Sequence, residues 1–179
     1  YFTADGAGYE QLPGFIWVSD RLVAWRNPGR PLITLPFVWV AGVPGAYVSG
    51  AVIHLMTTLI LATVFLRIGC SPLWAVLGLF HPTLALYSRT VMADGTAALF
   101  ILLAIRSGLG KRAPGVGLGL FLLLATACRY HLAIVTPFVA IALWVNRRGA
   151  DDCIQQVVCM LLVVSVGFIA LMVYNWVTM

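Results

Sequence analysis

His81, Arg89 and Asp94 all lie within residues 81–100, HPTLALYSRTVMADGTAALF, in a chain that is otherwise largely apolar. A carboxylate can take a proton from an attacking hydroxyl group, and a guanidinium can hold a phosphate through its planar fork. A charge inside a membrane segment costs at least about 2 kcal/mol, so it marks a candidate functional group. Asp94 is therefore the first candidate for chemistry.

A structural role also accounts for Asp94. If Ser88 or Thr90 caps the helix that follows, Asp94 lies near its first turn, where the helix dipole stabilises a carboxylate by about 0.3–1 kcal/mol. Arg89 and Asp94 are separated by about 140° around a helix, so they do not form the usual i,i+4 ion pair. We expect each of them to find its partner elsewhere.

Arg129 and two histidines are the other candidates. Arg129 lies between the apolar runs LLLATAC and YHLAIVTP, where it either reaches headgroup phosphates or binds the phosphate of a lipid ligand. His81 precedes Pro82 and predicts a helix break, with a capping or packing role favoured over metal ligation. His54 lies inside an apolar run and predicts a hydrogen bond between helices.

The composition identifies the elements that must position these side chains. Of the 179 residues, 61% are hydrophobic and 9% are charged, which indicates an integral membrane protein. The net charge of +5 is spread over single residues between apolar runs, so we expect no nucleic-acid binding. The four cysteines lack zinc-site spacing and are expected to be packing residues: Cys70, Cys128, Cys153 and Cys159.

Residues 46–179 predict an all-α, polytopic transmembrane module with about six membrane segments. The segments are expected near residues 46–66, 72–87, 92–105, 114–128, 132–145 and 154–174. Several are shorter than the roughly 20 residues that cross a bilayer, which implies local thinning or re-entrant helices. Gly115 and Gly119 in GVGLGLF predict close helix packing rather than a nucleotide-binding loop.

Residues 1–45 form a different region, with three of the six acidic residues and five of the nine prolines. We expect an outer loop with a juxtamembrane helix, because PGFIWVSDRLVAWR gathers apolar side chains on one helical face. A loop helix facing the solvent is the alternative. The following NPGRPLITLPF is expected to be extended and broken by prolines.

Charged loops orient the predicted segments. Alternate loops carry basic residues and fall on one side, which the positive-inside rule makes cytoplasmic: Arg67; Arg106, Lys111 and Arg112; Arg147 and Arg148. The opposite side then receives residues 1–45, Asp94 and Arg129, facing the periplasm if the membrane is a bacterial inner membrane. Asp151 and Asp152 are expected in a solvated cytoplasmic turn.

Four motifs, in order along nearly the whole chain, resemble the polytopic C-type (GT-C) glycosyltransferases. They are DGAGY, GRPLITLPF, HPTLALYSRTVMADGTAALF and ATACRYHLAIVTPF. The most similar branch is that of the protein mannosyltransferases and lipid A aminoarabinose transferases. Members of this family carry a helix before the first loop and further helices after the last motif. The resemblance therefore implies a partial chain, with sequence missing before Tyr1 and after Met179.

The resemblance implies an active site at the outer membrane face that uses a sugar carried on a polyprenyl phosphate. The residues that it assigns are catalytic Asp5 and Asp94 and substrate- or phosphate-binding Arg89, Arg129, Tyr9 and His81. In this interpretation Asp5 is the acid of the first loop, and Asp94 is the acid of the second. Related proteins often pair two acids in the first loop, whereas glycine and alanine follow Asp5, so the use of a divalent metal stays open.

Two functions follow from these observations. The first is a glycosyltransferase that moves a sugar from a polyprenyl-phosphate donor to an acceptor at the outer face. The second is a non-catalytic subunit of a larger membrane complex that binds lipid or partner helices. A transporter is disfavoured, because no two broken helices repeat in matching halves.

Overall fold

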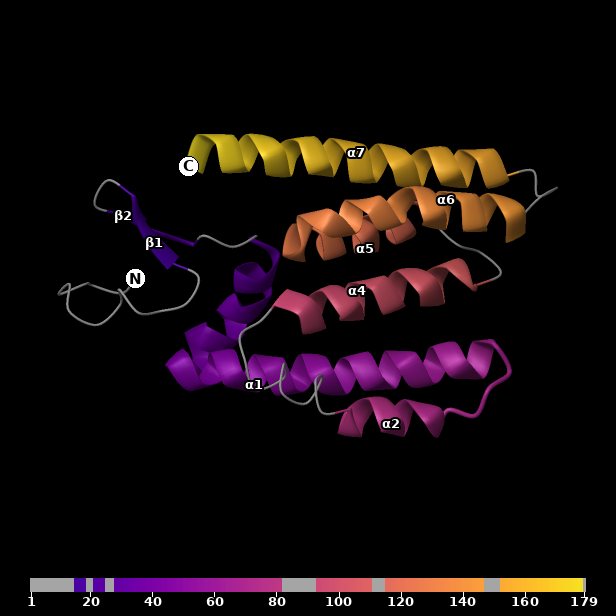
Figure 1. Ribbon diagram of the computed structural model, residues 1–179, viewed down its shortest axis with the longest axis horizontal. Coiled ribbons are helices and arrows are strands. Elements are labelled where there is room, and N and C mark those ends of the chain that lie inside the picture. Colours follow the sequence, from indigo (N-terminus) through magenta and orange to yellow (C-terminus); the bar gives the residue numbers. More distant parts are fainter. Residues whose placement is uncertain are drawn as a thin grey trace.

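A computed structural model of the chain describes residues 15–18, 21–24, 28–81, 93–110, 115–146 and 152–178 (Figure 1). The predicted all-α class is confirmed, with one small hairpin added. The elements in chain order are β1 (Phe15–Val18), β2 (Arg21–Ala24), α1 (Gly29–Arg67), α2 (Trp74–Phe80), α4 (Ala93–Gly108), α5 (Gly115–Cys128), the 3-10 helix η1 (Tyr130–Ile134), α6 (Val135–Asn146) and α7 (Cys153–Thr178).

The helices lie side by side in a layered bundle (Figure 1). Helix α4 packs between α1 and α5, α5 packs on α7, and α2 covers part of α1. At one end, Arg67 Nη1 donates a hydrogen bond to the carbonyl oxygen of Arg106 at 2.8 Å. The two basic residues therefore lie at the same end of the bundle, as the loop pattern predicts. We call it the Arg67 end, and the other the Arg129 end.

Helix α1 runs from Gly29 to Arg67, so it contains the predicted segment 46–66 and begins before it. The stretch GRPLITLPF is helical rather than extended. Pro31 falls in the first turn, where a backbone N–H has no helical partner and its loss carries no penalty. The first turn thus accommodates the residue that suggested a broken chain.

A kink at Gly42 divides α1 into two limbs, residues 29–41 and 43–67. Gly42 has φ 64° and ψ −150°, a conformation that glycine adopts far more readily than other residues. Pro36 and Pro44 lie on either side of the kink. Together these residues redirect the helix instead of ending it.

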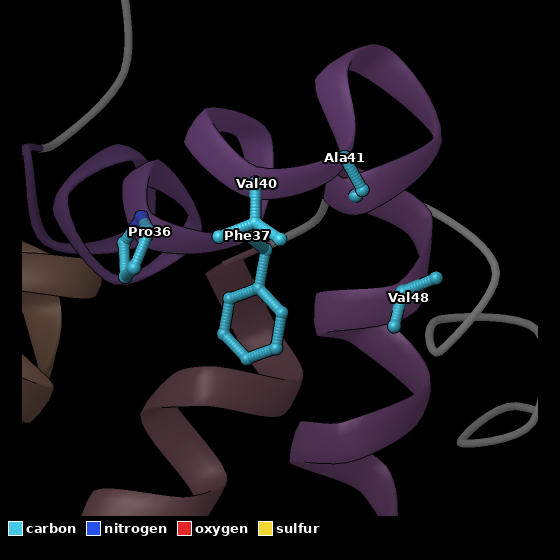
Figure 2. Close-up of a pocket in the computed structure, with 6 residues that line it drawn as sticks. Pro36, Phe37, Val40, Ala41 and Val48 are labelled. Atoms are coloured by element: carbon cyan, nitrogen blue, oxygen red, sulfur yellow. The ribbon is translucent and has the colours of Figure 1, made fainter.

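The inside of this kink holds an apolar pocket of about 330 Å³. Figure 2 shows Phe37 and Val40 on one limb and Val48 on the other. The remaining lining residues are Pro36, Ala41 and Gly45. The kink at Gly42 is therefore lined by apolar side chains.

Residues 15–24 form an antiparallel β-hairpin, and the predicted juxtamembrane helix is wrong for this segment. Phe15 pairs with Ala24, and Val18 pairs with Arg21. All four residues of FIWV are aromatic or β-branched, and RLVA adds Val23, which favours strands. Local β propensity thus outweighs the helical spacing of the apolar residues.

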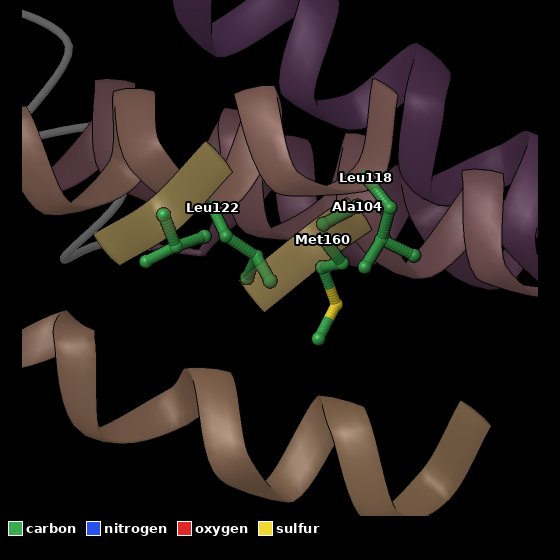
Figure 3. Close-up of a cluster of buried hydrophobic side chains, with 5 residues drawn as sticks. Ala104, Leu118, Leu122 and Met160 are labelled. Atoms are coloured by element: carbon green, nitrogen blue, oxygen red, sulfur yellow. The ribbon is translucent and has the colours of Figure 1, made fainter. Parts of the chain in front are cut away.

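The core lies where α5 packs between α4 and α7. Figure 3 shows Ala104, Leu118, Leu122 and Met160 meeting in one buried cluster, which also includes Val164. A Cβ atom added at Gly119 would lie 2.9 Å from the carbonyl oxygen of Met160. The predicted close packing at Gly119 is confirmed, because the α7 backbone leaves no room for a side chain there.

Gly115 packs in the same way. A Cβ atom there would collide with the backbone of Gln156, and the Gly115 N–H donates to Gln156 Oε1. Asp152 is exposed and accepts a hydrogen bond from Gln156 Nε2 at 3.3 Å, which fits its predicted place in a solvated turn. The first turn of α5 is thus tied to that of α7.

Two helices, α1 and α7, are long and apolar enough to cross a bilayer by length and composition. Helices α4, α5 and α6 have 16, 14 and 12 residues. At about 1.5 Å per residue they are about 24, 21 and 18 Å long, less than the roughly 30 Å of a hydrocarbon core. The two long helices suggest a membrane protein, while the six-segment topology stays a prediction.

Candidate functional site

Asp94 and Arg129 form an ion pair at the Arg129 end. Asp94 lies in the first turn of α4, as predicted, and Arg129 directly follows α5. Arg129 Nη2 donates to Asp94 Oδ2 at 2.5 Å, and the two side chains are 38% and 37% exposed. Arg129 is therefore the partner of Asp94, which was expected to pair with a residue other than Arg89. Because both side chains are partly exposed, the pair is accessible to solvent.

The helix dipoles favour this arrangement. The carboxylate of Asp94 lies at the positive N-terminal end of α4, and the guanidinium of Arg129 lies at the negative C-terminal end of α5. Arg129 has an extended backbone, with φ −148° and ψ 103°, which ends α5 and lets η1 begin. The charges are thus placed by the ends of two helices packed against each other.

The guanidinium of Arg129 retains an unused donor. Its Nε atom is buried and has no hydrogen-bond partner among the described residues. A guanidinium offers five N–H groups, and the carboxylate oxygen of Asp94 takes one of them through Nη2. Arg129 can therefore hold an anionic oxygen while it remains paired with Asp94.

Arg30 is a second arginine at this end and, unlike Arg129, it is buried; it is not among the site residues predicted from the sequence. Only 4% of Arg30 is exposed. Its Nη1 donates to Thr96 Oγ1 at 2.7 Å, and its Nη2 donates to Ser49 Oγ at 3.1 Å. The available signal was an arginine in the apolar motif GRPLITLPF with no acidic residue close in sequence.

The start of α1 packs directly on the end of α5. A Cβ atom at Gly29 would lie 2.7 Å from the backbone of both Ala127 and Cys128. Behind the ion pair, Cys128 shares a buried cluster with Ala93 and Ala97 of α4. Helices α1, α4 and α5 therefore meet directly beneath Asp94 and Arg129.

The end of α7 reaches the same region. Asn175 Nδ2 donates a hydrogen bond to the hydroxyl oxygen of Tyr130 at 2.5 Å. Tyr130 is the first residue of η1 and follows Arg129 directly. This contact anchors η1 and thereby limits the movement of Arg129.

The other predicted site residues are not joined to this pair. Asp5, Tyr9 and Arg89 lie outside the described residues, so their predicted roles stay predictions. His81 is exposed and ends α2 with an extended backbone, φ −62° and ψ 120°, which confirms the predicted helix break. Within the described ranges, His81 makes no hydrogen bond to Asp94 or Arg129.

His54 and the cysteines lie outside the ion pair, and the structure shows where each of them packs. His54 Nε2 lies 3.1 Å from the carbonyl oxygen of Leu79, which confirms a hydrogen bond between α1 and α2. Cys128 and Cys153 are buried, as expected of packing residues, but Cys70 is exposed, and the packing role is wrong there. Cys70 lies in the short connection after α1, where no helix covers it.

The part of the chain that the structure describes contains no group of three or more histidine, cysteine, aspartate or glutamate side chains that could hold a metal ion. The candidate groups there are therefore one carboxylate and two guanidinium groups. Such a set can accept a proton and bind an anion.

No protein-family model, no curated protein and no solved structure matches this chain. The functional interpretation therefore rests on its residues and their geometry.

Proposed function

We propose that this chain is part of a multi-pass membrane glycosyltransferase of the C type, which transfers a sugar from a polyprenyl-phosphate donor at the outer membrane face. The observation that carries the proposal is the Asp94–Arg129 pair, which lies at the opposite end of the bundle from Arg67 and Arg106. It combines a candidate base and a candidate phosphate ligand in one half-exposed position. Both groups are the types that sugar transfer from a phosphate requires.

In this mechanism the acceptor oxygen bonds to the anomeric carbon of the sugar, and the bond from that carbon to the phosphate oxygen breaks. Arg129 binds the departing polyprenyl phosphate and stabilises the negative charge that develops on it. The guanidinium N–H groups that Asp94 does not take up supply donors for a phosphate oxygen. Asp94, once it shares Arg129 with the phosphate, accepts the proton of the attacking hydroxyl. Asp5 completes the proposed site as the second catalytic carboxylate, and Tyr9, Arg89 and His81 bind substrate or phosphate.

Exposed tryptophans support a bilayer around the bundle. Trp39, in the first limb of α1, and Trp176, near the end of α7, are each 88% exposed, and both belong to the Arg129 end. Trp74 and Trp144 are exposed at the start of α2 and the end of α6, toward the Arg67 end (Figure 1). Tryptophans at both ends are typical of the two interfaces of a membrane.

The proposed topology has about six membrane segments in a bacterial inner membrane. By the positive-inside rule we assign the Arg67 end to the cytoplasm, and the Arg129 end, with residues 1–45, to the periplasm. The second limb of α1 and helix α7 cross fully. The shorter α4, α5 and α6 lie between them, where neighbouring helices cover part of their surface.

Transfer assays on the full-length protein in lipid vesicles test the proposal. We would supply a panel of polyprenyl-phosphate sugars and follow transfer of radiolabelled sugar. Asp94→Asn is expected to lower kcat by about 100-fold or more, because an amide cannot take the proton. Arg129→Met is expected to lower transfer by at least about tenfold, because the phosphate loses its cation.

Asp152→Asn and Arg67→Met are the matched controls, since each changes a charge of the same type at the Arg67 end. Both should retain transfer. If Asp94→Asn and Arg129→Met insert correctly and transfer sugar at the rate of the unchanged protein with every active donor, the assignment of these residues is wrong. If the unchanged protein transfers no sugar from any donor in the panel, the proposed activity is wrong.

One observation favours a second candidate, a non-catalytic subunit of a membrane complex. Helix α7 carries a long series of exposed apolar side chains: Ile154, Val158, Leu162, Val166, Ile169 and Val173. Neighbouring transmembrane helices of a partner could cover this surface. Purification in mild detergent distinguishes the two functions, because a subunit co-purifies with partner chains in fixed stoichiometry and the enzyme transfers sugar alone.

A further inference from the structure

We infer that Arg30 is a positioning residue that holds Asp94 against Arg129 by joining the two limbs of α1 to α4. The inference rests on the proposed function only for its effect on sugar transfer. Its geometric part concerns the packing of the bundle and can be tested without any substrate.

Arg30 belongs to the first limb of α1, and its guanidinium makes one hydrogen bond to α4 and one to the second limb. Nη1 donates to Thr96 of α4 at 2.7 Å, and Nη2 donates to Ser49 of the second limb at 3.1 Å. Both hydroxyl groups are fully buried, and Ser49 Oγ in turn donates to the carbonyl oxygen of Ala46 at 2.6 Å. The planar fork of one side chain therefore spans the kink at Gly42 and the neighbouring helix, which no short side chain at position 30 could do.

Arg30 and Gly29 contact the two helices that carry the charges of the site. These helices are α4, which carries Asp94, and α5, which Arg129 follows. Thr96 follows Asp94 within the first turns of α4. Gly29 contacts the backbone of Ala127 and Cys128, directly before Arg129. The first turn of α1 thus packs against the start of α4, which carries Asp94, and against the end of α5, which Arg129 follows. In the proposal this packing sets the separation of the two charges.

Because Arg30 is a buried cation, its stability depends on the hydroxyl groups that accept its hydrogen bonds. Arg30 is buried with neutral hydroxyl groups as its hydrogen-bond partners, and its Nε has none among the described residues. Removing one hydroxyl would leave a buried cation with less compensation, whereas replacing Arg30 with an apolar side chain of similar length removes the need for both. Arg30→Met should therefore keep the fold while loosening the connection between the limbs and α4.

A cysteine pair reports the separation. Ala97→Cys places a thiol opposite the native Cys128 in the buried cluster behind the ion pair. The variant is made with Cys70, Cys153 and Cys159 replaced by alanine, and iodine oxidation of the full chain in membranes is followed by gel mobility after proteolysis between α4 and α5. With Arg30 present, we expect rapid cross-linking. Arg30→Met should slow it by about fivefold or more, because α4 is no longer fixed to the start of α1.

Two further variants keep the test decisive. Arg67→Met is the matched control, since it removes an arginine hydrogen bond at the other end of the bundle and should leave cross-linking unchanged. Thr96→Val retains Arg30 but removes its acceptor on α4, and it replaces Arg30→Met if that variant does not accumulate in membranes. Cross-linking of Arg30→Met or Thr96→Val at the rate of the Arg67→Met control would overturn the inference.

A catalytic readout separates positioning from a general loss of stability. In the transfer assay, Arg30→Met should lower kcat by about tenfold with KM changed less than about twofold, since the carboxylate is displaced while the phosphate ligand remains. Its thermal unfolding midpoint should stay near that of Arg67→Met. If Arg30→Met slows cross-linking but the unchanged protein transfers no sugar, the proposed activity is wrong and the positioning role of Arg30 still holds.

Discussion

Arg129 Nη2 and Asp94 Oδ2 lie 2.5 Å apart, although the two residues belong to different helices and are separated by 35 positions. The carboxylate comes from the first turn of α4 and the guanidinium from the residue after α5. The pair therefore depends on how α4 and α5 pack, and its energy can be measured separately from that packing.

The side chains of Asp94 and Arg129 should show a measurable interaction free energy. A double-mutant cycle with Asp94→Asn and Arg129→Gln should give a coupling of about 0.2–1 kcal/mol, the range measured for solvent-exposed ion pairs. Reversible unfolding in detergent micelles provides the free energies. The charge-swapped variant Asp94→Arg with Arg129→Asp should not recover full stability, because both charges then oppose the helix dipoles. Full recovery would show that the dipoles contribute nothing here.

Gly119 should tolerate no side chain. Gly119→Ala would place a Cβ 2.9 Å from the Met160 carbonyl oxygen and 3.0 Å from Val163 Cβ, and overpacking of this kind costs about 1–3 kcal/mol. Gly95→Ala is the matched control, since nothing lies within 4 Å of a Cβ there. In α4 the control should be neutral or stabilising by up to about 1 kcal/mol. Equal thermal unfolding midpoints for the two variants would contradict the packing of α5 on α7.

His54 should contribute to holding α2 on α1. His54→Leu loses the hydrogen bond to the Leu79 carbonyl oxygen and should cost about 1 kcal/mol in the free energy of unfolding. His54→Gln retains a side-chain donor and should cost less. The comparison fails if the glutamine and leucine variants are equally stable, since the polar contact would then be irrelevant.

Labelling from the two sides of the membrane tests the proposed orientation. Cys70 is exposed just after α1, at the Arg67 end, and His131 is exposed in η1, at the Arg129 end. In intact cells, a membrane-impermeant maleimide should label His131→Cys at once and Cys70 only after permeabilisation. Cys128 and Cys153 are buried and should react slowly in either case. Labelling of Cys70 in intact cells would reverse the orientation.

Several features of the fold could be predicted because they depend on one residue and its immediate surroundings. A histidine inside an apolar run must find a polar partner, and His54 finds one on α2. Gly119 in an apolar helix indicates a close neighbour, and that neighbour is α7. Asp94 lies in the first turn of a helix, as predicted, while the proposed caps Ser88 and Thr90 lie outside the described residues. In each case the local pattern predicts the type of contact but not the partner.

The first part of the chain was predicted less well, because several weak local preferences compete there. Apolar spacing in residues 15–24 favours a helix, while side-chain type favours strands, and the strands prevail. The prolines after residue 27 predicted an extended chain, yet Pro31 falls in a first turn and Gly42 absorbs the change of direction. The position of a proline within the helix decides its effect, and helix starts are poorly defined by sequence.

The amino-acid sequence by itself determined that this protein is a set of apolar helices with few charges, and it predicted that Arg67 and Arg106 lie at one end. Hydrophobic patterning and the cost of burying charge are properties of short segments, so they can be recognised without knowing the packing. Only the tertiary structure decided that Arg129 is the partner of Asp94 and that Arg30 joins Ser49 and Thr96 beneath them. These contacts join residues 19 to 66 positions apart, and such partners are chosen by the packing of whole helices rather than by any local preference.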